Sequence, residues 1–377
     1  MSDPNPSSER YARQMLVPEI GNEGQARLAA ARVLCIGAGG LGCASLPYLA
    51  GAGVGHLTIV DHDRVERSNL QRQVLFGESS LGRAKADAAA ERLADLNPDI
   101  TIEAMATRLD AGNIEALFCR HDLIIDGSDN YATKFLCGDG AVKFGRPLVY
   151  ASATGMEAMI GVFDAARGPC LRCLFPEPPT GWVPNCAEAG VLGPLVGMAG
   201  CIQAAEAVKW LVGGTLEALV GRVWWIDARD MGSRQLEVRK RPDCAVCGIA
   251  PARITLHPAQ AMVSEIDPAH ARELEGAAFI DVREPDEFAQ GHITGAVNVP
   301  LSKLNADPET ELPPARCHVV YCRTGPRALS AVQALAQRYG EVRCLRGGIL
   351  AWDRPLAAGP GADDGTGRPR PAASRDP

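Results

Sequence analysis

The chain has 377 residues, of which 46% are hydrophobic and 22% charged, and its formal net charge is −7. This length predicts two or three domains, and the acidic balance argues against a nucleic-acid-binding surface because no broad basic excess is available. The first ten residues are polar, so no secretory signal is expected there. The 13 cysteines are therefore expected to serve metal or thiol chemistry in a reducing cytoplasm.

Residues 7–30 are expected to be helical and to precede a βαβ nucleotide-binding unit. An apolar strand over 33–36 runs into a glycine-rich turn, and a second strand over 57–60 ends at Asp61. The turn has the spacing G-x-G-x-x-G and contains Gly37, Gly39, Gly40 and Gly42. Such glycines let the backbone approach a phosphate, the following helix attracts anions, and the acidic residue binds ribose hydroxyls. Alone, this unit favours a dinucleotide such as NAD.

The sequence downstream alternates between strands and helices. A helix is expected over 81–96, and the expected strands are 101–106, 122–126, 147–150, 222–226 and 235–238. The alternation predicts a mostly parallel sheet with helices on both faces, and the two late strands are expected at its edge. The uncharged run 189–205 contains a proline and a glutamine and is short for a membrane span, so we interpret it as a buried helix.

Charged residues near the βαβ unit turn the prediction toward a mononucleotide with a reactive phosphate. Arg72 and Lys85 follow Asp61 and are candidates to bind a triphosphate, although an isolated pair of this kind often only solvates helix ends. Asp129 follows the buried strand 122–126, at the sheet edge where open α/β sheets bind ligands. Asp129 is a candidate Mg²⁺ ligand, and capping the helix that begins at Tyr131 is the alternative.

Five further cysteines carry distinct hypotheses. Two C-x-x-C knuckles contain Cys170, Cys173, Cys244 and Cys247. Four thiolates complete a tetrahedral shell, so a structural Zn²⁺ is preferred over a redox pair. Cys186 stands in a proline-rich connection, where a nucleophile and an inert thiol are both open interpretations.

Cys322 gives a sharper signal, because it follows the apolar strand 319–321 and faces the start of a helix. Arg323 and Arg327 lie in the same loop. The helix N-terminus and both guanidinium groups favour a thiolate, and they would hold a persulfide in the same place. Four residues separate Cys322 from Arg327, and this tight ring suits a sulfur atom better than a phosphate.

Two known families match these motifs. Residues 9 to about 248 resemble the MoeB/ThiF family, the bacterial relatives of ubiquitin-activating enzymes. The matching segments are Arg10–Gln14, Gly37–Gly42, Asp61, Ser68–Gln73, Lys85, Asp129–Asn130 and the two cysteine knuckles. Residues 254 to about 355 resemble a rhodanese domain. Its markers are Asp281–Glu284, Glu287–Ala296, the Cys322 loop and Gly347–Gly348. The combination is similar to MoeZ-type adenylyltransferase–sulfurtransferases.

The resemblance implies a fold and a domain plan. A Rossmann-like, mostly parallel α/β sheet with zinc knuckles is expected over 1–248, followed by a linker over 249–256. A smaller α/β rhodanese domain is expected over 257–355, and residues 356–377 are expected to form a disordered tail because they lack apolar periodicity.

The resemblance also implies a reaction. A ubiquitin-like sulfur carrier would insert its C-terminal Gly-Gly, and ATP with Mg²⁺ would activate the carboxylate as an acyl-adenylate. Residues implied to bind the nucleotide are Gly37, Gly39, Gly40, Gly42, Asp61, Ser68, Asn69, Leu70, Gln71, Arg72, Lys85, Asp129 and Asn130. The counterpart of Arg13 reaches in from a second subunit in the family, so a cytoplasmic homodimer is expected. A Cys322 persulfide, loaded by thiosulfate or a cysteine desulfurase, would then attack to give a thiocarboxylate, with Cys186 as a candidate resolving thiol.

Two alternatives remain open from the sequence. An NAD-dependent oxidoreductase explains Gly37–Gly42 and Asp61, but it leaves the knuckles and Cys322 without a purpose. An adenylyltransferase with a non-catalytic rhodanese module is the other. No nucleic-acid or membrane partner is expected, and the carrier pathway, with molybdopterin and thiamine biosynthesis as candidates, is not identified.

Overall fold

The chain forms two compact units, Met1–Ala259 and Gln260–Pro377, in a computed structural model. The structure describes residues 6–178, 190–256, 264–336, 338–339 and 341–359. Cys186 therefore lies outside the described residues, as does most of the tail expected over 356–377. The two units divide later than the boundary expected near Gly248, and each is described by itself.

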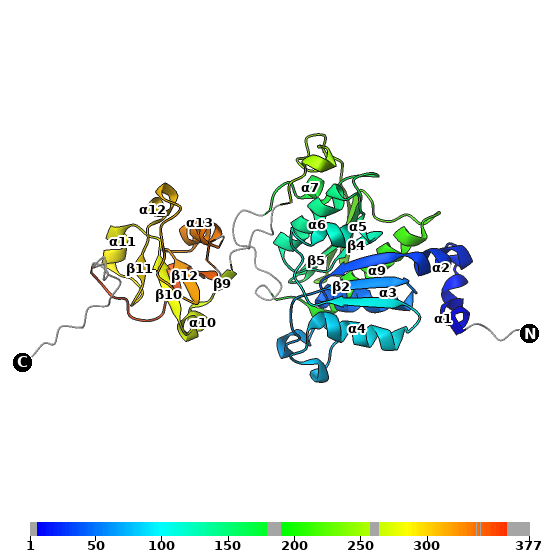
Figure 1. The fold of residues 1–377 in the computed structure, drawn as a ribbon, viewed down its shortest axis with the longest axis horizontal. Helices are drawn as coiled ribbons and strands as arrows, with labels where there is room; N and C mark the ends of the chain where they lie inside the picture. The colour runs from blue at the N-terminus through cyan, green and yellow to red at the C-terminus, as the bar shows by residue number, and fades with distance from the viewer. Residues whose placement is uncertain (1–5, 179–189, 257–263, 337, 340, 360–377) are drawn as a thin grey trace, which may run out of the picture. The chain divides into compact units, whose positions relative to one another are not determined.

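The first unit is built on an eight-stranded sheet of order β3-β2-β1-β4-β5-β6-β7-β8 (Figure 1). Its strands are β1 (Arg32–Ile36), β2 (His56–Val60), β3 (Thr101–Met105), β4 (Leu123–Asp126), β5 (Leu148–Thr154), β6 (Glu157–Phe163), β7 (Arg222–Asp227) and β8 (Gly232–Glu237). The strands from β3 to β5 are parallel, whereas β6, β7 and β8 pair antiparallel. The expected mostly parallel sheet is thus present, with the late strands at one edge and β6 as an additional strand.

Helices cover both faces of this sheet. The helices are α1 (Pro6–Met15), α2 (Gly21–Ala30), α3 (Gly40–Gly51), α4 (Lys85–Leu96), α5 (Ile114–Cys119), α6 (Tyr131–Lys143), α7 (Leu171–Leu174) and α9 (Gly193–Val212), with the short 3-10 helices η1 (Arg67–Asn69), η2 (Glu78–Ser80) and η3 (Pro251–Arg253). Along β1, Val33 and Cys35 pack in one core with α3, α4 and α9, whereas Leu34 and Ile36 pack in a second core with α5 and α6. A strand buried on both faces follows from its uninterrupted apolar sequence.

The N-terminal helix expected over 7–30 is divided in two. Helix α1 ends at Met15, and α2 begins at Gly21 after a turn that contains Pro18. Proline lacks an N–H and its ring clashes with the preceding turn, so it does not continue a helix.

Helix α9 is the one described helix that is long and apolar enough to cross a membrane by length and composition, and half of its apolar window is buried in the protein. Its residues Ala199, Ala204 and Ala207 are almost fully buried. The helix packs on α3 and on strands of the sheet. This position agrees with the buried helix predicted for the uncharged run.

The segment expected as a linker, 249–256, packs on the first unit. Ile254 is 3% exposed and belongs to the core beneath α5 and α6. The ammonium of Lys143 donates a hydrogen bond to the Ile254 carbonyl at 2.6 Å. An apolar side chain and a satisfied carbonyl hold this segment, so it is part of the first unit's fold.

The second unit has a five-stranded sheet of order β11-β10-β12-β13-β9, and all its pairings are parallel. Its strands are β9 (Ser264–Ile266), β10 (Ala277–Asp281), β11 (Val297–Asn298), β12 (Cys317–Tyr321) and β13 (Val342–Leu345), and its helices are α10 (Pro268–Glu273), α11 (Pro285–Gln290), α12 (Leu301–Ala306), α13 (Pro326–Leu335) and the 3-10 helix η4 (Gly348–Ala351). Side chains alternate along β12, with Val320 in a core beside α12 and α13 and Val319 in another beside α10 and α11.

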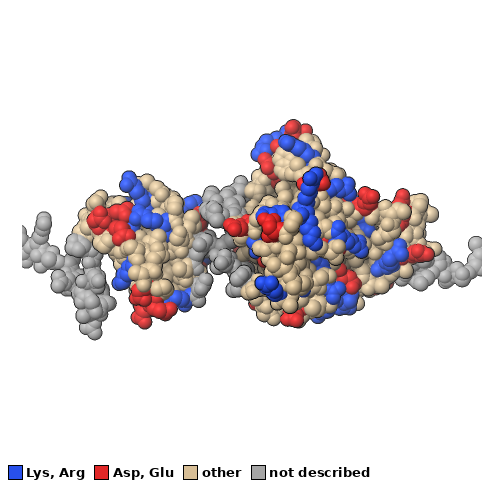
Figure 2. Space-filling model, turned by 90° about the horizontal axis from the view of Figure 1, so that it is seen from above, with Lys and Arg blue, Asp and Glu red and all other residues tan. Residues whose placement is uncertain are grey.

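Charges are mixed on the surface of both units. Figure 2 shows lysine and arginine side chains beside aspartate and glutamate side chains on the face that it presents. This interspersed pattern accompanies the net charge of −7.

Candidate functional site

The glycine-rich turn lies at the carboxyl ends of β1 and β4. Gly37 has φ +93, and a Cβ on it would stand 2.9 Å from the Gly127 carbonyl oxygen. A Cβ on Gly42 would stand 2.2 Å from the Gly37 carbonyl oxygen. Larger residues are therefore excluded at both positions, and the N-terminus of α3 faces the space above the strand ends.

Asp61 closes one side of this turn. Its carboxylate accepts hydrogen bonds from the Ala38 N–H at 2.7 Å and the Asp63 N–H at 2.8 Å. Asp61 is 8% exposed, and burial raises the pKa of its carboxyl despite these bonds. The structure thus brings Asp61 against the glycine loop, as the motif predicted.

Lys85 is held by a neighbouring carboxylate. Its ammonium lies 2.9 Å from Asp63 Oδ2, and the residue is only 6% exposed. Burial alone would raise the pKa of Asp63, but the hydrogen bond and charge of Lys85 outweigh it and hold this pKa below its usual value. Lys85 is therefore fixed beside the acidic group of the site.

The segment Ser68–Gln73 packs over the glycine turn. Arg72 Nη1 donates to the Ser68 carbonyl at 3.2 Å, and a Cβ on Gly40 would stand 3.6 Å from Arg72 Cγ. Asn69 closes the 3-10 helix η1, because its side-chain oxygen accepts from the Glu66 N–H at 3.1 Å. Leu70 packs against the core of the first unit, whereas Gln71 is exposed. The segment Ser68–Gln73 and the glycine turn therefore lie against each other.

Gln73 belongs to the same segment, but the motifs did not assign it to the site. It is 3% exposed, and its side-chain oxygen has no hydrogen-bond partner among the described residues. Its side-chain nitrogen lies 3.7 Å from the position of a Cβ on Gly39. A buried amide without a partner normally receives one from water or a ligand. The burial of Gln73 is what identifies it as a site residue, and the sequence does not show that burial.

The loop after β4 places Asp129 and Asn130 at the same edge. Asn130, rather than Asp129, caps α6, because its side chain accepts from the Thr133 N–H at 2.9 Å. The capping alternative for Asp129 is therefore wrong, and Asp129 is exposed.

Below this loop lies a buried ion pair that sequence analysis missed. Lys134 Nζ lies 3.2 Å from Asp126 Oδ2 and 2.7 Å from the Ala151 carbonyl. The Ser128 hydroxyl donates to the other Asp126 oxygen at 2.5 Å. Burial alone would lower the pKa of Lys134, but Asp126 raises it above its usual value. An acidic residue at the end of a fully apolar strand was the available signal, because a buried carboxylate needs a partner.

Arg13 is not brought to the glycine turn of its own chain. Helix α1 docks at the far end of α3, where Gln14 donates to the Ala52 carbonyl at 3.0 Å. Tyr11 lies beside the same end, bonded to Asn97 at 2.8 Å. A helix of 12 residues spans about 18 Å, which exceeds the reach of an arginine side chain. Arg13 is exposed.

The four knuckle cysteines meet in space. Sγ–Sγ distances are 3.9 Å for Cys170–Cys173, 3.6 Å for Cys170–Cys244 and 3.5 Å for Cys173–Cys247. A tetrahedral Zn²⁺ with bonds of about 2.3 Å needs sulfurs about 3.8 Å apart, whereas a disulfide needs about 2.05 Å. The residues fit a metal site that joins the start of α7 to the turn after β8.

The second unit places Cys322 directly after β12. The Gly325 N–H donates to Cys322 Sγ at 3.1 Å, and Cys322 is 1% exposed. The Ile349 N–H donates to the Cys322 carbonyl at 2.8 Å, so the Gly347–Gly348 turn supports the loop from behind. A Cβ on Gly348 would stand 2.5 Å from that carbonyl oxygen, which explains the glycine.

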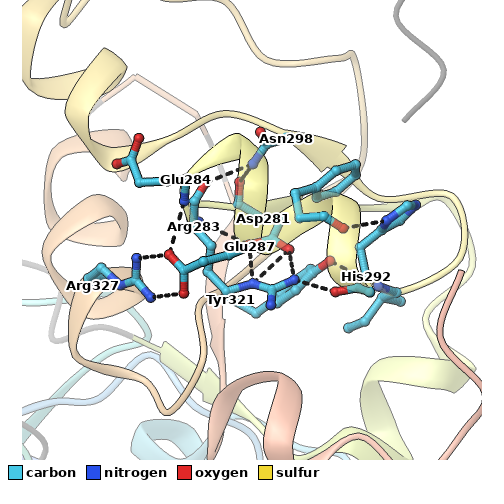
Figure 3. A network of polar contacts seen from close by, with 11 residues as sticks. Asp281, Arg283, Glu284, Glu287, His292, Asn298, Tyr321 and Arg327 are labelled. Carbon is cyan, nitrogen blue, oxygen red and sulfur yellow. Dashed lines mark hydrogen bonds and ion pairs between the residues drawn. The ribbon is translucent and has the colours of Figure 1, made fainter. Parts of the chain in front are cut away.

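Two ion pairs lie near this loop, and Figure 3 shows both of them. Arg327 Nη1 and Nη2 lie 2.6 and 2.8 Å from the two carboxylate oxygens of Glu287. Arg283 is buried and bonded to Asp281, at 2.6 Å for its shortest contact. Arg323 is exposed. Of the two predicted loop arginines, one is therefore paired and the other faces solvent.

A glycine-turn nucleotide fold with a four-cysteine cluster, joined to a unit with a cysteine loop, defines the class of E1-like activating enzymes fused to a rhodanese. Comparisons with known proteins agree. The ThiF family model matches residues 11–246, and the rhodanese-like domain model matches residues 267–355. The chain belongs to the ThiF family and carries a C-terminal rhodanese-like domain.

Curated relatives cover most of the chain. It is 41% identical to the probable adenylyltransferase/sulfurtransferase MoeZ of Mycobacterium tuberculosis, over 92% of this chain and 93% of that protein. It is 36% identical to the adenylyltransferase and sulfurtransferase MOCS3 of Drosophila willistoni, over 93% of this chain and 84% of that protein. The chain is thus an enzyme of this adenylyltransferase and sulfurtransferase kind.

Two further similarities concern the first unit. The chain is 45% identical to the sulfur carrier protein adenylyltransferase of Thermus thermophilus, over 65% of this chain and 92% of that protein. The fold is similar to that of Escherichia coli MccB in a crystal structure with MccA-N7isoASN. The TM-score is 0.58 at 21% identity, and the match covers 65% of this chain and 76% of that one.

Proposed function

We propose that the first unit uses ATP to adenylate the C-terminal Gly-Gly carboxylate of a ubiquitin-like sulfur carrier protein, and that the second unit then supplies sulfur. The observation that carries this proposal is the pairing of two sites in one chain, a glycine turn closed by Asp61 and a loop cysteine bonded to the Gly325 N–H. Relatives named for sulfur carrier adenylylation and for sulfur transfer support the same pairing.

In the first step, the Asp61 carboxylate accepts hydrogen bonds from the ribose hydroxyls, and the N-terminus of α3 faces the phosphates. Arg72 and Lys85 offset the charge that develops as pyrophosphate leaves, and Asp129 is the proposed ligand of Mg²⁺. The side-chain oxygen of Gln73, buried and without a partner among the described residues, accepts a hydrogen bond from the nucleotide. Preorganised groups of this kind each contribute on the order of a hundredfold in rate.

In the second step, the Cys322 thiolate takes a sulfur atom and becomes a persulfide. The Gly325 N–H and the N-terminus of α13 stabilise negative charge on that sulfur. The persulfide attacks the acyl-adenylate and AMP leaves. A second thiolate then attacks Cys322 Sγ, so that the S–S bond of the acyl disulfide breaks and the thiocarboxylate leaves with the electron pair. The disulfide that forms at Cys322 is reduced by an external thiol before the next turnover. Cys186, outside the described residues, remains the proposed resolving thiol.

We further propose that two copies assemble, so that Arg13 of one chain reaches the nucleotide site of the other. The docking of α1 at the far end of α3 supports this arrangement, because it separates Arg13 from its own glycine turn.

The test is an intact-mass measurement of a Gly-Gly-ending carrier after incubation with the enzyme, ATP and a sulfur donor. The expected result is exchange of one carboxylate oxygen for sulfur, lost in Cys322→Ala while pyrophosphate release continues. Adenylation without any sulfur gain in the wild type would leave only an adenylyltransferase with a non-catalytic second unit. An NAD(H)-dependent absorbance change without carrier modification would restore the oxidoreductase hypothesis.

A further inference from the structure

The loop that carries Cys322 is flanked by a carboxylate that neutralises one of its two arginines. Glu287, on α11, receives both guanidinium nitrogens of Arg327 at 2.6 and 2.8 Å, and Figure 3 shows the two groups facing each other. Such two-pronged arginine–carboxylate pairs are among the strongest and most directional in proteins. Glu287 also accepts a hydrogen bond from the Glu284 N–H at 3.3 Å, which fixes the carboxylate from its other side.

This pair stays ionised throughout the physiological range. The hydrogen bond from Arg327 is the main reason that the pKa of Glu287 falls to about 2, and Glu287 in turn raises the pKa of Arg327. Arg327 stands in the first turn of α13, directly after the loop that begins at Cys322, so its guanidinium belongs to the surroundings of this loop. The net charge that Arg327 and Glu287 present to an incoming donor is therefore close to zero.

The other groups around the loop add little positive charge. The guanidinium of Arg283 is occupied by Asp281 and by the Gly291 carbonyl. Position 326 is a proline, which has no N–H to offer an anion. Arg323 is exposed, and no ion pair of its side chain occurs within the described part of the chain. Of the arginines near the loop, Arg323 alone is thus left without an ion pair among the described residues to meet an anionic donor.

Two chemical classes of donor place different demands on these charges. Thiosulfate is a dianion: the Cys322 thiolate attacks its outer sulfur, the S–S bond breaks, and sulfite leaves with the electron pair. A thiol persulfide, R–S–S⁻, is a monoanion at its reacting end: the same attack transfers the terminal sulfur and releases the thiolate R–S⁻. Both reactions yield the same Cys322 persulfide, but thiosulfate brings one more negative charge to the loop.

We propose that Glu287 is the residue that sets donor specificity, and that by neutralising Arg327 it makes the Cys322 loop favour a thiol persulfide over thiosulfate. Glu287 does not touch the reacting sulfur and acts through Arg327, so it is a positioning residue. The inference rests on the proposed function, because it concerns the reaction that loads Cys322.

The experiment compares two donors, thiosulfate and cysteine persulfide, on the full-length wild type and on Glu287→Gln. The second-order rate constant for persulfide formation is followed by intact mass, with Cys322→Ala as the blank for other cysteines. In Glu287→Gln the thiosulfate constant should rise about fivefold, as expected when one exposed charge is uncovered, and more at low ionic strength. The cysteine persulfide constant should change less than twofold. A cysteine desulfurase charged with L-cysteine serves as a third donor. Comparing its rate constant with that of cysteine persulfide distinguishes loading by a protein-bound persulfide from loading by a free one.

Glu284→Gln is the matched control. Glu284 lies three residues away on the same turn and accepts a hydrogen bond from the Ser302 hydroxyl at 3.0 Å instead of pairing with a loop arginine. It should leave the ratio of the two constants unchanged. In Glu287→Gln combined with Arg327→Gln, which removes both charges, the ratio should return toward the wild-type value.

A ratio unchanged in Glu287→Gln, an equal loss with both donors, or the same gain in Glu284→Gln would each overturn the specificity role. Absence of Cys322 loading by either donor in the wild type would instead overturn the proposed sulfur transfer. The two failures are therefore distinguishable, and thermal melting of each variant shows whether the second unit still folds.

Discussion

At the scale of single residues, the nucleotide site rests on groups that do not themselves face the ligand. Lys134 and Asp126 form a nearly water-free pair, 4% and 0% exposed, under the loop that presents Asp129. The Lys134 ammonium also donates to the Ala151 carbonyl and so connects α6 to β5. The pair therefore couples the position of the Asp129 loop to the sheet.

Replacing Lys134 by methionine should destabilise the first unit by about 3 to 5 kcal/mol, because it leaves the Asp126 carboxylate buried without a counter-ion. Urea unfolding in a Trp352→Phe background, where the remaining tryptophans all lie in the first unit, measures this loss. Lys143→Met on the same helix is the control. Lys143 bonds only the Ile254 carbonyl among the described residues, so it should cost about 1 kcal/mol. Equal losses in the two variants would contradict the argument.

Sequence reasoning identified the residues whose chemistry is local. Asp61 and the glycine turn lie within one βαβ unit, so their spacing alone defines them. Arg13 was selected as a candidate from the family resemblance, and only the docking of α1 shows that it is far from its own glycine turn. Lys134 was missed because a lysine in a helical segment is usually exposed, and the pairing with Asp126 depends on how α6 packs.

At the scale of elements, strands with continuous apolar sequence were predicted well, whereas β6, β9 and β13 were not among the expected strands. β4 is buried at every position and was identified. β6 was missed because Gly161 and the polar Glu157 interrupt its apolar pattern. β13 and β9 are short and lie at one edge of the second sheet, where tertiary pairing rather than local sequence defines them.

The cysteine cluster belongs to the scale of elements, because a metal bound to it would hold the four-residue helix α7 against the turn after β8. A helix this short is not stable by itself. Cys244→Ser should therefore lower bound zinc from about one per chain to near zero, because the tetrahedral shell loses one ligand. Hydrogen exchange at 170–175 and 241–248 should accelerate while the second unit is unchanged. Metal content by atomic emission and exchange by mass spectrometry measure these effects.

Cys119→Ser provides the control for the cluster, because Cys119 is exposed and lies outside it. It should retain zinc and wild-type exchange. Full zinc retention in Cys244→Ser, or unchanged exchange at the two segments, would contradict a structural metal site.

At the scale of the whole molecule, the proposed dimer makes each nucleotide site a product of two chains. The glycine turn, Asp61 and Lys85 come from one chain, and Arg13 comes from the other. An isologous dimer repeats this exchange twice, so both sites need both copies. Variants that damage opposite sides of the shared site should therefore complement each other.

Arg13→Ala and Lys85→Ala should each lose on the order of a hundredfold in carrier adenylation, because each removes a group that offsets phosphate charge. When the two variants are mixed and exchange subunits at random, half of the dimers are mixed, and each of these has one intact site. Activity should then recover to about a quarter of the wild-type value. Pyrophosphate release measured before and after mixing tests this expectation. A mixture that stays at the average of the two variants would show that Arg13 acts on its own chain or not at all. The far-end docking of α1, which separates Arg13 from its own glycine turn, favours recovery.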